Sequence, residues 1–374
     1  MNKSSHSKKT SILVKLLGSE KRQKITIPLL AILIGLVVGG IIIALTGSNP
    51  FKAFYNLLQG CGLARKPKYG GKKGMITDFM DYLDYTTPMI LASLAFAVSM
   101  KAGLFNIGIS GQMMVAGFLS TVLVGYSSLS AGMALPLVIL IGLISGALVG
   151  ALVGLLKYHF NINEVVSTIM LNYIFRYIIT FFINMYYVDP VSRQSKQINA
   201  PSRLSLQKVP VAGYKMTIPL GFIIALLAVV FVYVLMEKTK TGFEIKAVGS
   251  SRNAARYSGI NVGKNMILAM TISGGLSGLA GVTYFMGYMG SIRPGVLVNT
   301  GFDSVAVALL GANNPFGIIF SSLFISGLNN GSTYMSSSSG VEPEISSVII
   351  GIILVFSACA TYIKYLVNRK EVES

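Results

Sequence analysis

The stretch Lys101-Ala-Gly-Leu-Phe-Asn-Ile-Gly-Ile-Ser-Gly-Gln112 opens a long part of the chain that carries no charge. The next charged residue after Lys101 is Lys157, so residues 102–156 hold no Asp, Glu, Lys or Arg. Such a run is typical of a chain inside a lipid bilayer, where every polar group needs a protein partner or a watery cavity. Asn106 and Gln112 therefore either bond neighbouring helices or line a route through the membrane.

Further charge-free runs predict an all-α polytopic membrane protein. A spanning helix needs about 20 mostly apolar residues, and turn-forming residues at 126–132 and 311–315 divide the two longest runs. We expect about ten transmembrane helices, of which the second and the eighth are short. They lie near residues 25–46, 84–100, 104–125, 131–156, 164–187, 216–236, 265–289, 302–312, 315–331 and 345–364.

The basic residues predict the orientation of the chain. The formal net charge of +18 lies almost wholly in the connections between the expected spans. With both termini cytoplasmic, 18 Lys and Arg residues lie inside and 12 outside, which agrees with the positive-inside rule. We expect a cytoplasmic basic N-terminus over 1–24, a transmembrane domain over 25–364 and a cytoplasmic tail over 365–374. This placement argues for a multi-pass protein of the cell membrane and against nucleic-acid binding.

The sequence contains no set of residues for catalysis or cofactor binding. Gly263-Lys264 lacks the following Ser or Thr of a phosphate-binding loop, and no nucleophile–base–acid set is present. His6 and His159 are the only histidines, which argues against a metal site built on histidine. Carboxylates lie only at the ends of the expected spans. We therefore expect no enzymatic activity and no cofactor, and energy from a separate ATPase rather than from a proton gradient.

Two features predict how the helices pack and where a cargo route lies. Gly142, Gly146, Gly150 and Gly154 are spaced four apart, which makes a smooth helix face for close packing. Phe105-Asn106 and Phe302-Asp303 occupy related positions in two halves, 84–187 and 265–364, as in transporters built from inverted repeats. We expect the central pathway at these junctions, with the alternative that the amides only bond neighbouring backbone. The candidate pathway residues are Asn106, Gln112, Asn172, Phe302 and Asp303.

The connection 237–264 is the longest polar segment on the expected cytoplasmic side. Ser250 or Ser251 can cap a short helix over 252–257, which Gly259 would end, and a second helical turn is expected over 243–247. Small helices of this kind suit docking to another protein. The alternative is a solvated hairpin.

Several blocks of the chain resemble the permease subunits of bacterial ABC importers for nucleosides and simple sugars, in the branch that works with basic membrane lipoproteins. The blocks are Gly103-Leu-Phe-Asn-Ile-Gly-Ile-Ser-Gly-Gln112, Asn163-Glu-Val-Val-Ser-Thr-Ile-Met-Leu-Asn-Tyr173, Thr241-Gly-Phe-Glu-Ile-Lys-Ala-Val-Gly249, Asn253-Ala-Ala-Arg-Tyr-Ser-Gly-Ile260 and Gly301-Phe-Asp-Ser-Val-Ala-Val-Ala-Leu-Leu-Gly-Ala312. The family often carries an acidic residue where Ser110 stands. The basic 47–83 loop is also longer than the family pattern suggests.

The resemblance implies a type II importer fold with two pseudo-symmetric halves and nucleoside uptake driven by a separate ABC ATPase subunit. It also implies a second, different permease and an extracellular substrate-binding lipoprotein as partners. The coupling loop for the ATPase would be shaped by Gly242, Glu244, Ala247, Gly249, Asn253, Ala254, Ala255 and Gly259. A permease for ribose or another simple sugar remains an alternative, and a gradient-driven carrier or channel acting alone is a more distant one.

Overall fold

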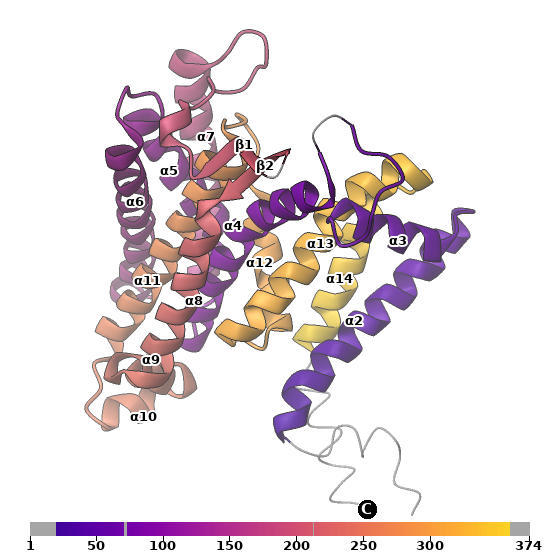
Figure 1. Cartoon of the computed structure of the whole chain (residues 1–374). Coiled ribbons are helices and arrows are strands. Elements are labelled where there is room, and N and C mark those ends of the chain that lie inside the picture. The colour runs from indigo at the N-terminus through magenta and orange to yellow at the C-terminus, as the bar shows by residue number, and fades with distance from the viewer. Residues whose placement is uncertain (1–19, 71–72, 212, 360–374) are drawn as a thin grey trace, which may run out of the picture.

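The computed structural model describes residues 20–70, 73–211 and 213–359, and in these ranges the chain is almost entirely helical (Figure 1). The larger helices are α2 (Glu20–Leu45), α3 (Pro50–Gly60), α4 (Met75–Lys101), α5 (Ile109–Ser120), α6 (Ala131–Phe160), α7 (Glu164–Phe182), α8 (Leu220–Lys238), α9 (Lys240–Ser250), α10 (Arg252–Tyr257), α11 (Val262–Val282), α12 (Asn299–Leu310), α13 (Pro315–Ser339) and α14 (Glu344–Ala358). The π-helical turns η1 (Thr121–Gly125), η2 (Ile183–Tyr187) and η4 (Thr283–Met289) extend α5, α7 and α11. One hairpin, β1 (Ser205–Val211) and β2 (Tyr214–Pro219), precedes α8.

Within the described residues, six helical segments are long and apolar enough to cross a membrane. They lie in α2, α4, α6, α7 with η2, α8, and α11 with η4. The other four predicted spans also contain helices, but α5, α12 and the described part of α14 are short. Helix α13 has 25 residues, yet its second half, from Asn329 to Ser339, consists mainly of amides and hydroxyls. A mostly helical membrane fold is thus confirmed; in the described residues six of the ten or so predicted spans are long apolar helices and the others are shorter or partly polar.

Several predicted boundaries differ from the structure, each for a local reason. The second span, expected to be short at 84–100, belongs to the 27-residue helix α4, which begins at Met75 because Asp78, Asp81 and Asp84 lie within the helix rather than before it. The span 104–125 becomes helical only at Ile109, because Gly103 adopts φ +68° and ends α4. The span 216–236 begins in strand β2, since an absence of charge does not distinguish strand from helix. Helix α13 continues past 331 until Gly340, with φ +66°, ends it. Helix α2 begins at Glu20, within the predicted N-terminal segment 1–24. Residues 360–364 of the last span lie outside the described residues.

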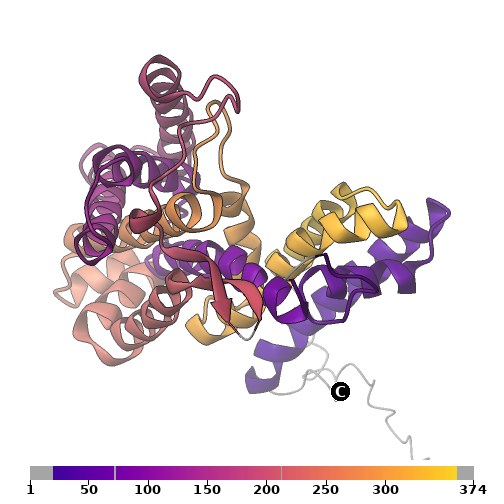
Figure 2. The ribbon, with the colours of Figure 1, turned by 45° about the horizontal axis from the view of Figure 1, so that its top comes forward.

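Helices α6 and α11 pack together most closely, and Figure 2 shows the body they belong to beside a second group of helices. A Cβ atom on Gly146 would lie 2.3 Å from the carbonyl oxygen of Gly274, and one on Gly150 would lie 2.2 Å from that of Met270. Gly142 and Gly154 also face α11 at close range. The second group pairs α2 with α14 and α3 with α13.

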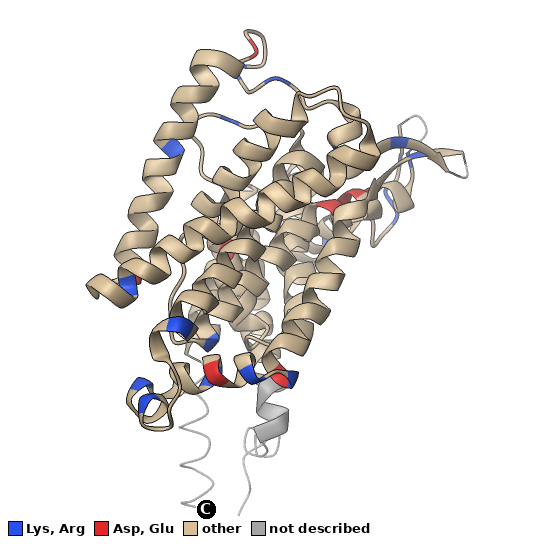
Figure 3. Cartoon of the chain, turned by 90° about the vertical axis from the view of Figure 1, so that its left-hand side faces the viewer, with Lys and Arg blue, Asp and Glu red and all other residues tan. Residues whose placement is uncertain are grey.

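Charged side chains gather at the two ends of the bundle (Figure 3). One end, which we call the hairpin end, carries β1 and β2, and the opposite end carries α9 and α10. Arg176 lies between them on α7, with its guanidinium carbon 5.3 Å from the centre of the Tyr177 ring. Among the described residues no carboxylate lies within 4.0 Å of Arg176.

We expect Gly150→Ala to destabilise the bundle, because its methyl group would collide with the α11 backbone rather than with a side chain that can rotate. Overpacking of this kind costs about 1–3 kcal/mol. Gly351→Ala in α14 is the matched control, since nothing lies within 4 Å of the Cβ position there. Thermal unfolding of the purified protein in detergent measures both. Equal melting temperatures for the two variants would contradict the packing argument.

Candidate functional site

The start of α5 is held by a buried network of amide side chains. Asn106 accepts a hydrogen bond from the Gly108 amide at 2.9 Å and donates to Gln112 Oε1 at 3.2 Å and to Ser273 Oγ at 2.9 Å. Asn106 and Gln112 are 0% and 1% exposed. The structure therefore brings these two predicted residues together, behind the surface of the molecule.

Asn172 of α7 supports the same segment from the other side. Its Oδ1 accepts from the Gly111 amide at 2.8 Å, and its Nδ2 donates to the Ile107 carbonyl at 3.0 Å. These bonds satisfy backbone groups where the chain changes from an extended segment to a helix. Gln112 Nε2 is buried and makes no hydrogen bond to any described residue.

The beginnings of α5 and α12 touch each other. Ser110 Oγ donates to the Val298 carbonyl at 2.7 Å, and a Cβ atom on Gly301 would lie 2.2 Å from Ser110 Oγ. Phe302 follows on the next residue and is 41% exposed. Asp303 is half-buried and accepts a 3.0 Å hydrogen bond from Asn329 Nδ2 of α13. The two predicted junctions are thus adjacent, but Phe302 and Asp303 do not join the buried amide network.

A cavity of about 250 Å³ lies at the start of α12, toward the hairpin end, and we call it the α12-start cavity. It is lined by Tyr85 of α4, by Tyr284, Phe285 and Met289, and by Arg293 and residues 296–300. Sequence reasoning missed these tyrosines and Arg293, because Tyr85 is about 200 residues away in the chain from the segment 284–300 that supplies the rest of the lining. Their only sequence signal was an aromatic cluster at the end of the 265–289 span.

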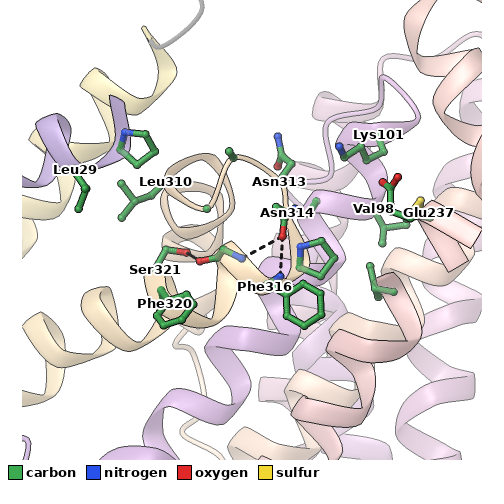
Figure 4. A pocket seen from close by; sticks show the side chains of 18 of the residues that line it. Leu29, Val98, Lys101, Glu237, Leu310, Asn313, Asn314, Phe316, Phe320 and Ser321 are labelled. Atoms are coloured by element: carbon green, nitrogen blue, oxygen red, sulfur yellow. Dashed lines mark hydrogen bonds between the residues drawn. The ribbon is translucent and has the colours of Figure 1, made fainter. Parts of the chain in front are cut away.

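A larger cavity of about 900 Å³ lies at the other end of α12, near α9 (Figure 4). Leu29 of α2 lies on one side, and Val98, Lys101 and Glu237 lie on the other, with the turn 311–314 between them. Asn313 lines this cavity in a left-handed conformation, φ 52°, and its Oδ1 is buried without a partner among the described residues. Helix α12 therefore has one cavity at each end.

The segment 237–264 forms two short helices rather than an extended hairpin. Ser251 caps α10 through its side chain at the Ala254 amide, and Gly259, with φ +77°, follows its end. Helix α9 packs tightly at both of its ends. A Cβ atom on Gly242 would lie 2.1 Å from the carbonyl oxygen of Leu235, and one on Gly249 would lie 2.1 Å from the carbonyl oxygen of Lys101.

The remaining candidate residues of this segment divide into anchoring and exposed groups. Glu244 accepts a 3.0 Å hydrogen bond from Asn265 Nδ2 of α11, Ala247 is half-buried, and Ala255 is only 3% exposed. Ala255 therefore belongs to the core rather than to a docking face. Asn253 and Ala254 are exposed, as are two aromatics that sequence reasoning did not single out, Phe243 at 64% and Tyr257 at 94%.

No cluster of three or more His, Cys, Asp or Glu side chains suited to a metal ion occurs within residues 20–70, 73–211 and 213–359.

Comparison with known families identifies the chain. Residues 79–358 match the family described as branched-chain amino acid transport system / permease component. The chain belongs to this family. It is the permease component of an ABC transporter, an integral membrane protein that does not itself hydrolyse ATP.

The relatives include permeases of two bacteria. The nucleoside ABC transporter permease protein NupB of Lactococcus lactis is 36% identical over 94% of this chain and 95% of its own length. The guanosine ABC transporter permease protein NupP of Bacillus subtilis is 33% identical over 92% of this chain and 95% of its own. NupC, a second nucleoside permease of Lactococcus lactis, is 30% identical over 64% of this chain and 77% of its own length. No solved structure matches the chain.

We expect Asn172→Ala to destabilise the protein by about 1–3 kcal/mol, because the Gly111 amide and the Ile107 carbonyl would stay buried without partners. Asn253→Ala, at an exposed position on α10, serves as the control for loss of an asparagine. Chemical or thermal unfolding in detergent gives the difference. A stable Asn172→Ala variant would show that the network does not hold α5 in place.

Proposed function

We propose that this protein is the nucleoside permease of a bacterial ABC importer, located in the cell membrane with both termini cytoplasmic. The observation that carries the proposal is the 36% identity to a nucleoside permease over 94% of the chain. The guanosine permease of Bacillus subtilis supports it independently, with 33% identity over 92% of the chain.

The working unit in this proposal is a heteromer. Lactococcus lactis has both NupB and NupC among the relatives, and this chain is more similar to NupB, so the second permease is expected to be a different protein. A separate ABC ATPase would supply the energy, and an extracellular lipoprotein would deliver the cargo. The element order supports a type II importer with two related halves, since a long helix precedes a short one in both α4–α5 and α11–α12.

The cargo route in this proposal runs along α12. A cavity at each end of this helix supports the assignment, and the exposed Phe302 lies between them in the chain. Asp303 and Phe302 would face the route, whereas Asn106, Gln112 and Asn172 would hold the α5 junction from behind. Helices α9 and α10 would couple this route to the ATPase through their exposed residues.

Transport of nucleosides by the complete importer in liposomes is the test of the function. Uptake of guanosine or uridine with ATP inside is expected, and none without the ATPase subunit. Uptake of ribose with no nucleoside uptake would assign the protein to the sugar alternative. Uptake by this chain alone would make it a gradient-driven carrier or channel.

The Ala254→Arg variant is expected to lose most of its ATP-driven uptake while keeping its abundance in the membrane. Its bulky charge would stand on the exposed face of α10, where the ATPase would dock. The control is Val191→Arg, because Val191 is 91% exposed in the connection between η2 and β1, far in the chain from α10. Normal uptake by Ala254→Arg would place the coupling surface elsewhere.

Phe302→Ala is expected to lower nucleoside uptake about five- to ten-fold, since a base stacked on an aromatic ring gains about 1–3 kcal/mol. Phe181→Ala, at a 57% exposed position on α7 outside both cavities, is the matched control. Uptake is compared at equal membrane abundance. Wild-type uptake and cargo preference in Phe302→Ala would remove Phe302 from the route.

A further inference from the structure

The α12-start cavity combines aromatic rings with one cationic side chain, that of Arg293. Tyr85 and Tyr284 line it, and both rings contact Tyr288 behind them, at centroid distances of 5.2 Å and 6.2 Å. Tyr288 therefore fixes the orientation of two rings that belong to different helices. Ring faces held in this way suit a flat, uncharged ligand.

Polar contacts behind Tyr85 give this wall further rigidity. Tyr85 interacts with Asn329, and Asn329 also donates its 3.0 Å hydrogen bond to Asp303. The wall thus joins α4, α12 and α13. The cavity itself is lined by α4, by η4 and by the start of α12, so a movement of these elements relative to one another would change its shape, as a transport site requires.

Arg293 lines the cavity from a loop whose backbone is hydrogen-bonded before and after this residue. The Ile292 amide donates to Ser195 Oγ at 2.8 Å, and the Gly295 amide donates to Thr180 Oγ1 at 2.7 Å. Arg293 itself is exposed, and no carboxylate of the described residues lies within 4.0 Å of it. Its guanidinium is therefore available to a ligand, while its backbone is fixed.

These side chains match one edge of a purine base. A guanidinium donates two parallel hydrogen bonds to the O6 and N7 acceptors of guanine, whereas adenine presents a donor at N6 beside N7. The cavity, at about 250 Å³, is smaller than the roughly 300–1,000 Å³ of sites for drug-sized ligands. It suits the base of a nucleoside, with the ribose at its mouth.

We propose that the α12-start cavity is a binding site of the permease itself for 6-oxopurine nucleosides, in which Tyr85 and Tyr284 pack against the base and Arg293 binds its O6 and N7 edge. The inference rests on the proposed nucleoside transport and adds a selectivity step within the membrane component. The site holds its cargo weakly, since only the base is enclosed.

Photolabelling of the purified full chain in nanodiscs with 8-azidoguanosine tests this site without the lipoprotein or the ATPase. The label is expected on peptides that contain Tyr85 or Tyr284, and excess guanosine should compete more strongly than adenosine. Arg293→Gln should reduce this labelling about ten-fold, which is within the discrimination of a bidentate contact to guanine. Arg293→Lys should also lose the preference for guanosine, because an ammonium group lacks the planar fork.

Arg193→Gln is the control, since Arg193 is an exposed arginine at the same end that does not line the cavity. Labelling that is equal in Arg293→Gln and wild type, or that maps to the cavity near Lys101, would overturn the proposal. Stronger competition by guanosine monophosphate than by guanosine would show an anion site and would also overturn it. Nucleoside uptake by the wild-type importer in liposomes separates the outcomes. If uptake occurs without labelling of the cavity, only this inference fails; if uptake is absent, the proposed function fails first.

Discussion

Backbone groups at two breaks in the helix bundle must find hydrogen-bond partners without help from water, and the arrangement around α5 and α12 depends on this constraint. The segment 102–108 is satisfied in part by Asn106 and Asn172, which bond backbone groups on both sides of the break. The second segment, 290–298, reaches the first through the bond from Ser110 to Val298. Because the Ser110 side chain at the start of α5 bonds the backbone just before α12, the positions of these two short helices relative to each other are fixed.

Helices α4 and α11 connect the two ends of the molecule. The end of α4 contacts α9 at Gly249, and α4 carries Tyr85 near its other end. Near the start of α11, Asn265 donates a hydrogen bond to Glu244 of α9, and the extension of α11, η4, carries Tyr284. Helix α9 thus contacts the two helices that carry Tyr85 and Tyr284 of the α12-start cavity. On its other side α11 packs closely against the glycine face of α6.

Much of the fold could be predicted because a helix that crosses a bilayer must be long and nearly free of charge. Residues 102–156, which hold α5 and most of α6, carry no charge at all. The hairpin 205–219 was missed because the end of its second strand, from Met216 on, is as free of charge as the helix that follows it. The polar half of α13 was assigned to a loop because Asn, Ser and Thr are common in loops. In the structure it is helical because no proline or left-handed residue interrupts it before Gly340.

The sequence by itself determined the membrane class, the placement of the helices and the two short helices of the 237–264 segment, because these depend on local composition, capping residues and glycines. Only the tertiary structure decided which polar residues meet. Asn106, in the break itself, and Asn172, on α7, converge on the same backbone segment although they are far apart in the chain, and Ala255 turns inward while its neighbour Ala254 stays exposed. The cavity of Tyr85, Tyr284 and Arg293 is a product of long-range packing, which no local pattern of residues encodes.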